Sequence, residues 1–130
     1  MNIKIKYSSD DPIYLQIKNQ IQDAILNDEV DKNKALPSIR FLAKELRVSV
    51  ATTKRAYDEL IKDGLIDSVP GKGNFVKDIN PQFIREKYTL QIEEKLKEAI
   101  DLSKLIGFSR DELHDLLDLM EEEYEWHLKS

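Results

Sequence analysis

The sequence predicts a mainly α-helical chain of three helices and a β-hairpin, followed by a tail of two more helices. Two observations predict this order. Apolar residues recur at helical spacing in five segments, and residues typical of helix ends bound those segments. Between the third and fourth segments, two short extended runs flank a glycine-containing turn, which is typical of a hairpin. At 130 residues, the chain is long enough for one small domain and an appendage.

The first helix is predicted to begin at Asp11-Pro12, because a proline in the first turn loses no helical hydrogen bond. Its apolar stripe repeats every four residues and consists of Ile13, Ile17, Ile21 and Ile25, with Ala24 beside it. The polar segment 27–34 that follows is predicted to be a loop.

Two serines are predicted to cap the next two helices, Ser38 the second and Ser49 the third, which runs to about Asp63. The inward face of the second helix consists of Ile39, Leu42, Ala43 and Leu46. The inward face of the third consists of Thr53, Ala56, Tyr57 and Leu60, at spacings i, i+3, i+4 and i+7. The residues left facing outward on the third helix are Val50, Ala51, Thr52, Lys54, Arg55 and Asp58.

Gly64 is predicted to end the third helix, and a β-hairpin follows it. Its strands are predicted at 65–69 and 74–77, joined by the turn Pro70-Gly71-Lys72-Gly73. Three helices followed by a hairpin with a basic tip is the element order of a winged helix-turn-helix domain. We assign residues 1–78 to that domain.

Residues 79–130 are predicted to form a two-helix dimerisation domain. The first tail helix runs from about Pro81 to Leu105, and the capping-box pattern from Ser109 to Glu112 opens the second. About 50 residues are too few for an independent ligand-binding domain. Two apolar stripes on two helices also call for a further partner surface. We assign the dimer contacts to Ile84, Tyr88, Ile92, Leu96, Leu113, Leu117, Met120 and Tyr124.

The net charge of −5 is spread unevenly along the chain. Residues 1–77 carry 13 basic and 11 acidic side chains, whereas residues 78–130 carry 7 and 14. Residues 32–55 contain seven basic side chains and a single acidic one, Glu45. Screening confines charge effects to about 8–10 Å, so this local excess decides whether phosphate can be bound. Taken alone, the charge pattern is also compatible with a solvated basic face.

Several classes of protein are disfavoured. The chain has no cysteine, no apolar run long enough for a membrane span and no signal-peptide pattern, which fits a cytoplasmic protein. His114 and His127 are the only histidines, and both fall on an acidic amphipathic helix. His114 and Asp118 stand at i, i+4, but an exposed polar face explains them better than a metal site. Gly71 and Gly73 are not followed by the Lys-Ser/Thr pair and the helix that a P-loop requires. We therefore expect no enzyme activity, metal or cofactor.

Three ordered motifs resemble the GntR family of bacterial regulators: PIYLQIKNQIQDAI, LPSIRFLAKELRVSVATTKRAYDELIKDGLI and PGKGNFV. The short two-helix tail resembles the YtrA branch of that family. The resemblance implies a transcriptional regulator that binds double-stranded operator DNA as a homodimer. It also implies an inverted-repeat operator, repression of transcription and, in this branch, control of a transporter operon.

By this resemblance, the DNA contacts fall on Ser38, Arg40, Ser49, Val50, Thr52, Lys54, Arg55, Gly71, Lys72 and Gly73. One departure matters, because Val50 stands where relatives carry Arg or Lys. The common operator of the family therefore does not transfer, and Val50 suits a thymine methyl group instead. For Thr52, helix capping is an equal alternative to a DNA contact. For Lys54 and Arg55, the alternative is a solvated helix face.

Two further alternatives concern partners. A winged helix that docks proteins in place of DNA would show an acidic or apolar outward face on its third helix. Here the side chains of that face are basic or small, which favours DNA as the partner. A small-molecule effector at the tail or at the domain junction is compatible with the family, and no motif identifies its chemistry.

Overall fold

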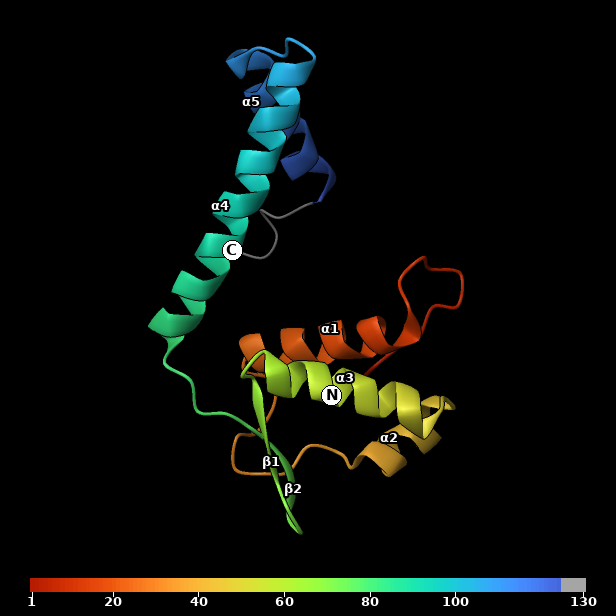
Figure 1. The fold of residues 1–130 in the computed structure, drawn as a ribbon. Helices are drawn as coiled ribbons and strands as arrows, with labels where there is room; N and C mark the ends of the chain where they lie inside the picture. The colour runs from red at the N-terminus through yellow and green to blue at the C-terminus, as the bar shows by residue number, and fades with distance from the viewer. Residues whose placement is uncertain (125–130) are drawn as a thin grey trace. The chain divides into compact units, whose positions relative to one another are not determined.

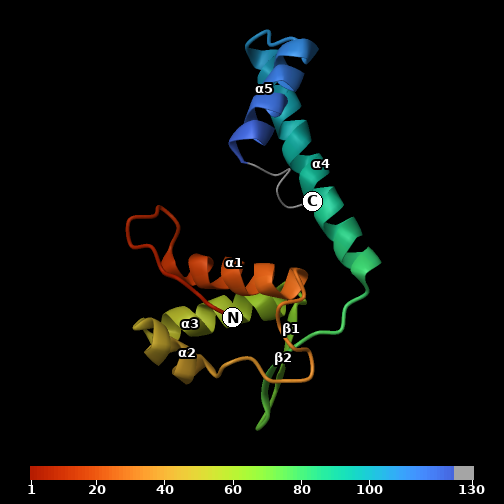
Figure 2. The ribbon, with the colours of Figure 1, turned by 180° about the vertical axis from the view of Figure 1, so that it is seen from behind.

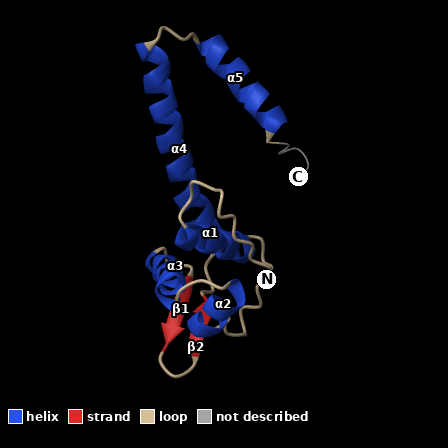
Figure 3. Cartoon of the chain, turned by 90° about the vertical axis from the view of Figure 1, so that its right-hand side faces the viewer, coloured by secondary structure: helices blue, strands red, loops and turns tan. Residues whose placement is uncertain are grey.

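The computed structural model describes residues 1–124 and confirms the predicted order of elements (Figure 1). Its helices are α1 (Ile13–Leu26), α2 (Ile39–Leu46), α3 (Val50–Lys62), α4 (Pro81–Leu105) and α5 (Arg110–Glu123). Its strands are β1 (Ile66–Val69) and β2 (Gly73–Val76), which form the hairpin drawn in red in Figure 3. The chain divides into two compact units, Met1–Ile79 and the residues from Asn80 onward.

Helix α1 begins directly after Pro12 and buries Ile17, Ile21, Ala24 and Ile25. Residues 1–6, for which the sequence predicted no element, are bound to this helix by two glutamine side chains. The Lys4 backbone N–H donates to Gln20 Oε1 at 2.9 Å, and Gln20 Nε2 donates back to the Lys4 carbonyl at 2.8 Å. Gln16 makes the same pair of bonds with Lys6, at 2.8 and 3.0 Å. Each glutamine amide thus bonds both the N–H and the carbonyl of one residue, as a neighbouring strand would in a sheet. The side chains of Ile3 and Ile5 pack on the core.

Helices α2 and α3 form the helix-turn-helix, and both predicted caps are present. The Ser38 hydroxyl accepts from the Phe41 backbone N–H at 3.1 Å, and the Ser49 hydroxyl accepts from that of Thr52 at 3.0 Å. Arg47 ends α2 in the left-handed conformation, with φ of 56°. Gly64, with φ of 76°, follows the last residues of α3 as predicted. Helices α1 and α3 lie side by side in both ribbon views (Figures 1 and 2).

The hairpin pairs β1 with β2 in antiparallel register, with Ile66 opposite Val76 and Val69 opposite Gly73. Strand β1 begins one residue later than predicted, whereas β2 begins and ends one residue earlier than predicted. Beyond the strands, the Lys77 backbone N–H still donates to the Leu65 carbonyl at 2.9 Å. An additional bridge joins Ala35 to Phe75, so the segment that leads into α2 lies along β2.

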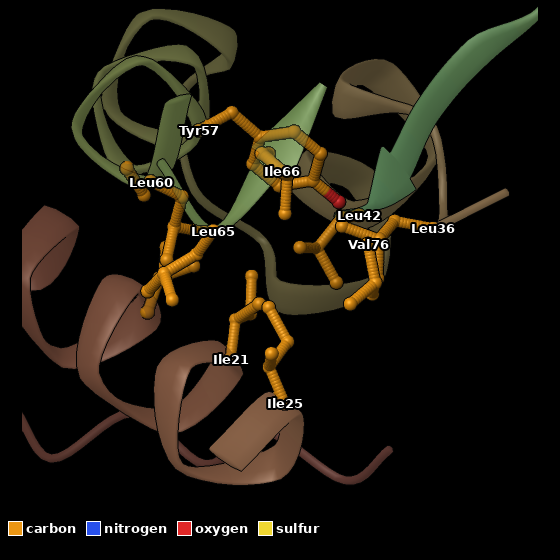
Figure 4. Close-up of a cluster of buried hydrophobic side chains, with 11 residues drawn as sticks. Ile21, Ile25, Leu36, Leu42, Tyr57, Leu60, Leu65, Ile66 and Val76 are labelled. Carbon is orange, nitrogen blue, oxygen red and sulfur yellow. The ribbon is translucent and has the colours of Figure 1, made fainter. Parts of the chain in front are cut away.

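The core of the first unit lies between α1, α3 and the hairpin, where apolar side chains from all three converge (Figure 4). The four predicted inward residues of α3, namely Thr53, Ala56, Tyr57 and Leu60, are fully buried. From α2, Leu42 and Ala43 are buried, while Ile39 and Leu46 pack on the edge of the cluster.

Helices α4 and α5 make the second unit. Asn80 caps α4 by accepting from the Gln82 backbone N–H at 2.9 Å, and Ser109 and Glu112 form the predicted capping box of α5. No residue described in α4 or α5 is buried. Ile84, Tyr88 and Leu113 are half-buried, whereas Ile92, Leu96, Leu117, Met120 and Tyr124 are exposed. Within residues 1–124, no helix is both long and apolar enough to cross a lipid bilayer.

Candidate nucleic-acid interface

The start of α2 presents Ser38 and Arg40 on a segment that is fixed from two sides. Ser38 is occupied as the helix cap, and Arg40, the second residue of the helix, is exposed. The segment before the helix is held by a hydrogen bond of 2.6 Å from the Tyr57 hydroxyl to the Pro37 carbonyl. It is also held by a bond of 2.7 Å from the Leu36 backbone N–H to the Asn74 carbonyl. Burial raises the pKa of Tyr57 to about 12, so its hydroxyl remains a donor.

The start of α3 presents a small, largely apolar surface. Val50 and Ala51 are exposed there, and the short alanine side chain lets another surface approach the helix backbone. Thr52 is half-buried, and its Oγ1 accepts a hydrogen bond of 2.8 Å from the Ser49 hydroxyl. Ser49, and not Thr52, caps α3, and the hydroxyl hydrogen of Thr52 can still be donated to another acceptor.

The two cations of α3 are held in different ways. Lys54 Nζ lies 2.7 Å from Asp58 Oδ2, one helical turn along, and both side chains are more than half exposed. The guanidinium carbon of Arg55 lies 3.7 Å from the centroid of the Tyr14 ring, which belongs to α1. The sequence predicted neither partner. A helical i, i+4 spacing was the available signal for Asp58, whereas nothing in the sequence pairs Tyr14 with Arg55.

The hairpin tip presents the basic wing. Gly71 and Gly73 have φ of 76° and 116°, a region that side-chain-bearing residues rarely adopt, and the exposed Lys72 stands between them. The Lys72 backbone N–H donates to the Val69 carbonyl at 3.0 Å and closes the turn. A methyl group at Gly73 would also lie 3.4 Å from the Cβ atom of Ala35. Both features favour glycine at position 73.

The ten predicted contact residues thus come from three segments that the fold ties together. Helix α2 packs on α3, and the chain before α2 is bridged to β2. Among residues 1–124, no group of three or more His, Cys, Asp or Glu side chains is arranged to hold a metal ion. His114 is exposed on α5, and His127 lies outside the described residues.

Comparison with known proteins agrees with the geometry. The family model for bacterial regulatory proteins of the gntR family matches residues 13–76. The transcriptional repressor YtrA of Bacillus subtilis is 30% identical over 113 residues, which cover 87% of each chain. The chain belongs to the GntR family. The likeness to its YtrA branch, predicted from the motifs and the tail, is confirmed.

Solved structures show a similar fold. YtrA from Sulfolobus acidocaldarius, a GntR-family transcription factor, is 36% identical and superposes with a TM-score of 0.60, covering 73% of this chain and 97% of that one. The structure of AraR(DBD) in complex with operator ORX1 is 26% identical with a TM-score of 0.53, covering 59% of this chain and 99% of that one. The winged helix-turn-helix prediction is confirmed. This GntR-family protein is a DNA-binding transcription regulator and not an enzyme.

Proposed function

We propose that this GntR-family protein is a repressor that binds an inverted-repeat operator as a homodimer. The observation that carries the proposal is the start of α3, a small exposed surface on a helix that packs against α2, whose own start is fixed by Tyr57. A helix of this kind fits the major groove and offers its first residues to the base edges. The relative from Bacillus subtilis is itself named a repressor.

The proposed DNA contacts divide into two classes. Val50, Thr52 and Arg40 are assigned to base edges, where Val50 meets a thymine methyl and Arg40 meets guanine. Ser38 and Ser49, at helix starts, are assigned to phosphate groups. Lys54, Arg55, Gly71, Lys72 and Gly73 are assigned to the DNA backbone, where the glycines let the wing turn approach closely.

Dimerisation is assigned to the second unit, because its apolar side chains have no cover within the described chain. Ile92 is 58% exposed, Leu96 51%, Leu117 43% and Met120 42%. Monomeric proteins rarely expose so many large apolar side chains together. Two-fold pairing is the commonest way to bury such a surface, since each chain uses the same patch. Two-fold symmetry then requires two half-sites about one helical turn apart in inverted repeat.

The biological setting is proposed from the family alone. Control of a transporter operon follows the YtrA branch, and the cytoplasm is the place of action because the proposed operator is chromosomal.

Binding to duplex DNA at increasing salt tests the DNA assignment. If the dimer neutralises roughly 6–10 phosphates, affinity should fall by about 10³–10⁵ between about 50 and about 200 mM salt. The probe is a genomic fragment that carries the region upstream of the protein's own gene. An affinity that does not change with salt would contradict the proposal.

Charged substitutions in the tail test the dimer. Ile92→Asp and Leu117→Asp should give monomers with a folded winged unit, because an aspartate would be buried without a partner at the proposed interface. These monomers should bind a full operator little better than a half-site. Gln91→Asp, an exposed neighbour of Ile92, is the control and should remain dimeric. Sedimentation measures the outcome, and dimeric Ile92→Asp and Leu117→Asp variants would refute the assignment.

A further inference from the structure

Arg55 occupies a distinctive place on α3. It stands one helical turn after Ala51 on the outward face, beside the first turn of α1. Its guanidinium carbon lies 3.7 Å from the centroid of the half-buried Tyr14 ring, and Tyr14 is the second residue of α1. The stack therefore joins the exposed face of α3 to a different helix.

The charge of Arg55 is available to an outside anion, in contrast to that of its neighbour. Lys54 is paired with the carboxylate of Asp58. Among the ion pairs of residues 1–124, none includes Arg55. An aromatic face attracts a guanidinium without using its N–H donors, because the attraction comes from the ring electrons. The stacked group therefore keeps its fork of donors, which matches the oxygens of a phosphate.

A surface depression lies next to the stack. It has a volume of about 410 Å³ and is lined by Pro12, Ile13, Tyr14, Ala51, Thr52 and Arg55. The small side chain of Ala51 and the hydroxyl of Thr52 form its α3 side. A phosphodiester oxygen that enters this depression meets the guanidinium of Arg55 on the side of α3 that faces α1.

We propose that Tyr14 is a positioning residue that holds Arg55 at the α1 side of α3, where Arg55 binds a backbone phosphate and does not read a base. The inference rests on the proposed DNA-binding function and deepens it. Tyr14 acts through Arg55: its ring limits the rotamers of a long side chain, so less freedom is lost when the phosphate binds.

The test is a double-mutant cycle in the full-length chain, with Tyr14→Leu, Arg55→Ala and the two together. Binding is measured at several salt concentrations to a duplex of arbitrary sequence, because a backbone contact forms with any sequence. Tyr14→Leu should weaken binding by roughly two- to fivefold for each protomer, the range expected of an exposed cation–π contact. Arg55→Ala should lower the salt slope by about 0.9 for each phosphate released.

The decisive result is the coupling. Tyr14→Leu should have no further effect once Arg55 is alanine, and Tyr14→Phe should bind like the wild type because it keeps the ring. Thermal unfolding of each variant establishes that the winged unit remains folded. Equal effects of Tyr14→Leu with and without Arg55 would overturn the positioning role. A salt slope in Arg55→Ala equal to that of the wild type would overturn the phosphate assignment.

The wild type separates this inference from the proposed function. Steep salt dependence in the wild type with an additive cycle would overturn only the role of Tyr14. A wild type whose binding to DNA is independent of salt would overturn both proposals.

Discussion

Replacing Tyr57 by phenylalanine removes one oxygen atom from the centre of the first unit and tests how the start of α2 is held. The lost hydrogen bond to the Pro37 carbonyl is 2.6 Å long, and the Tyr57 side chain is fully buried. A bond of this kind contributes about 0.5–1.5 kcal/mol, and the carbonyl left without its partner adds to the loss. We expect the free energy of unfolding to fall by about 1–2 kcal/mol. For a unit of this size, the melting temperature should fall by about 5–15 °C.

The same variant should change how stability depends on pH. Burial raises the pKa of Tyr57 from 10.0 to about 12. The folded state therefore keeps a proton that the unfolded state loses above pH 10. The contribution of protonated Tyr57 to the free energy of unfolding is fully present below pH 10. It is lost as the pH rises toward 12, at about 1.4 kcal/mol per pH unit. Because Tyr57→Phe lacks this loss, the advantage of the wild type should shrink and then reverse.

Urea unfolding followed by circular dichroism, at about pH 8 and about pH 11, measures both effects. Tyr7→Phe is the matched control, because Tyr7 is 73% exposed and has no predicted role. It should behave like the wild type at both values. If Tyr57→Phe matches the wild type near pH 8 and declines in parallel with it at higher pH, the reasoning about this hydroxyl is refuted.

Three other substitutions probe the remaining supports of the interface. Ser49→Ala should destabilise the winged unit by about 0.5–2 kcal/mol in thermal unfolding, because α3 loses its cap. Ser68→Ala, at an exposed serine of β1, is the control and should not change stability. Equal stability of the Ser49→Ala variant and the wild type would contradict the capping role. Gly73→Ala should lower the free energy of unfolding by about 1–2 kcal/mol and weaken DNA binding, since φ of 116° is strained for alanine. An unchanged melting temperature would argue against this strain. Lys18→Met should lower stability by up to about 1 kcal/mol, because the 3.1 Å pair with Asp63 is largely shielded from water, whereas Lys95→Met, in an exposed pair, should have no measurable effect. Chemical denaturation compares these two lysine variants, and equal losses would count against shielding as the cause.

The sequence by itself determined the elements, because their signals are local. The repeat of Ile17, Ile21 and Ile25 places one face of α1 in the core. Ser38, Ser49 and Ser109 mark three helix starts through bonds that span only three residues. The hairpin was predicted from its glycine turn, and its strand ends differ by one residue because Gly73 already pairs with Val69, while only one hydrogen bond, from Lys77 to Leu65, continues beyond Val76.

Candidate contact residues were predicted from the order of the motifs, but the partners of those residues were not. Residues that adjoin in sequence, such as Lys54 and Arg55, carry the same charge and the same exposure pattern. Only the packing of α1 on α3 gives one of them an aromatic partner and leaves the other with a carboxylate.

Tertiary structure alone decided the contacts that hold the N-terminal segment and the start of α2 in place. Gln16 and Gln20 bind a segment at least ten residues away, Tyr57 reaches Pro37, and Leu36 pairs with Asn74. Each joins a polar group to a backbone group, and any exposed amide or hydroxyl satisfies such a group equally well. Hydrophobic periodicity identifies which faces are buried, whereas the choice among equivalent polar partners depends on which groups the packed core brings within hydrogen-bond distance.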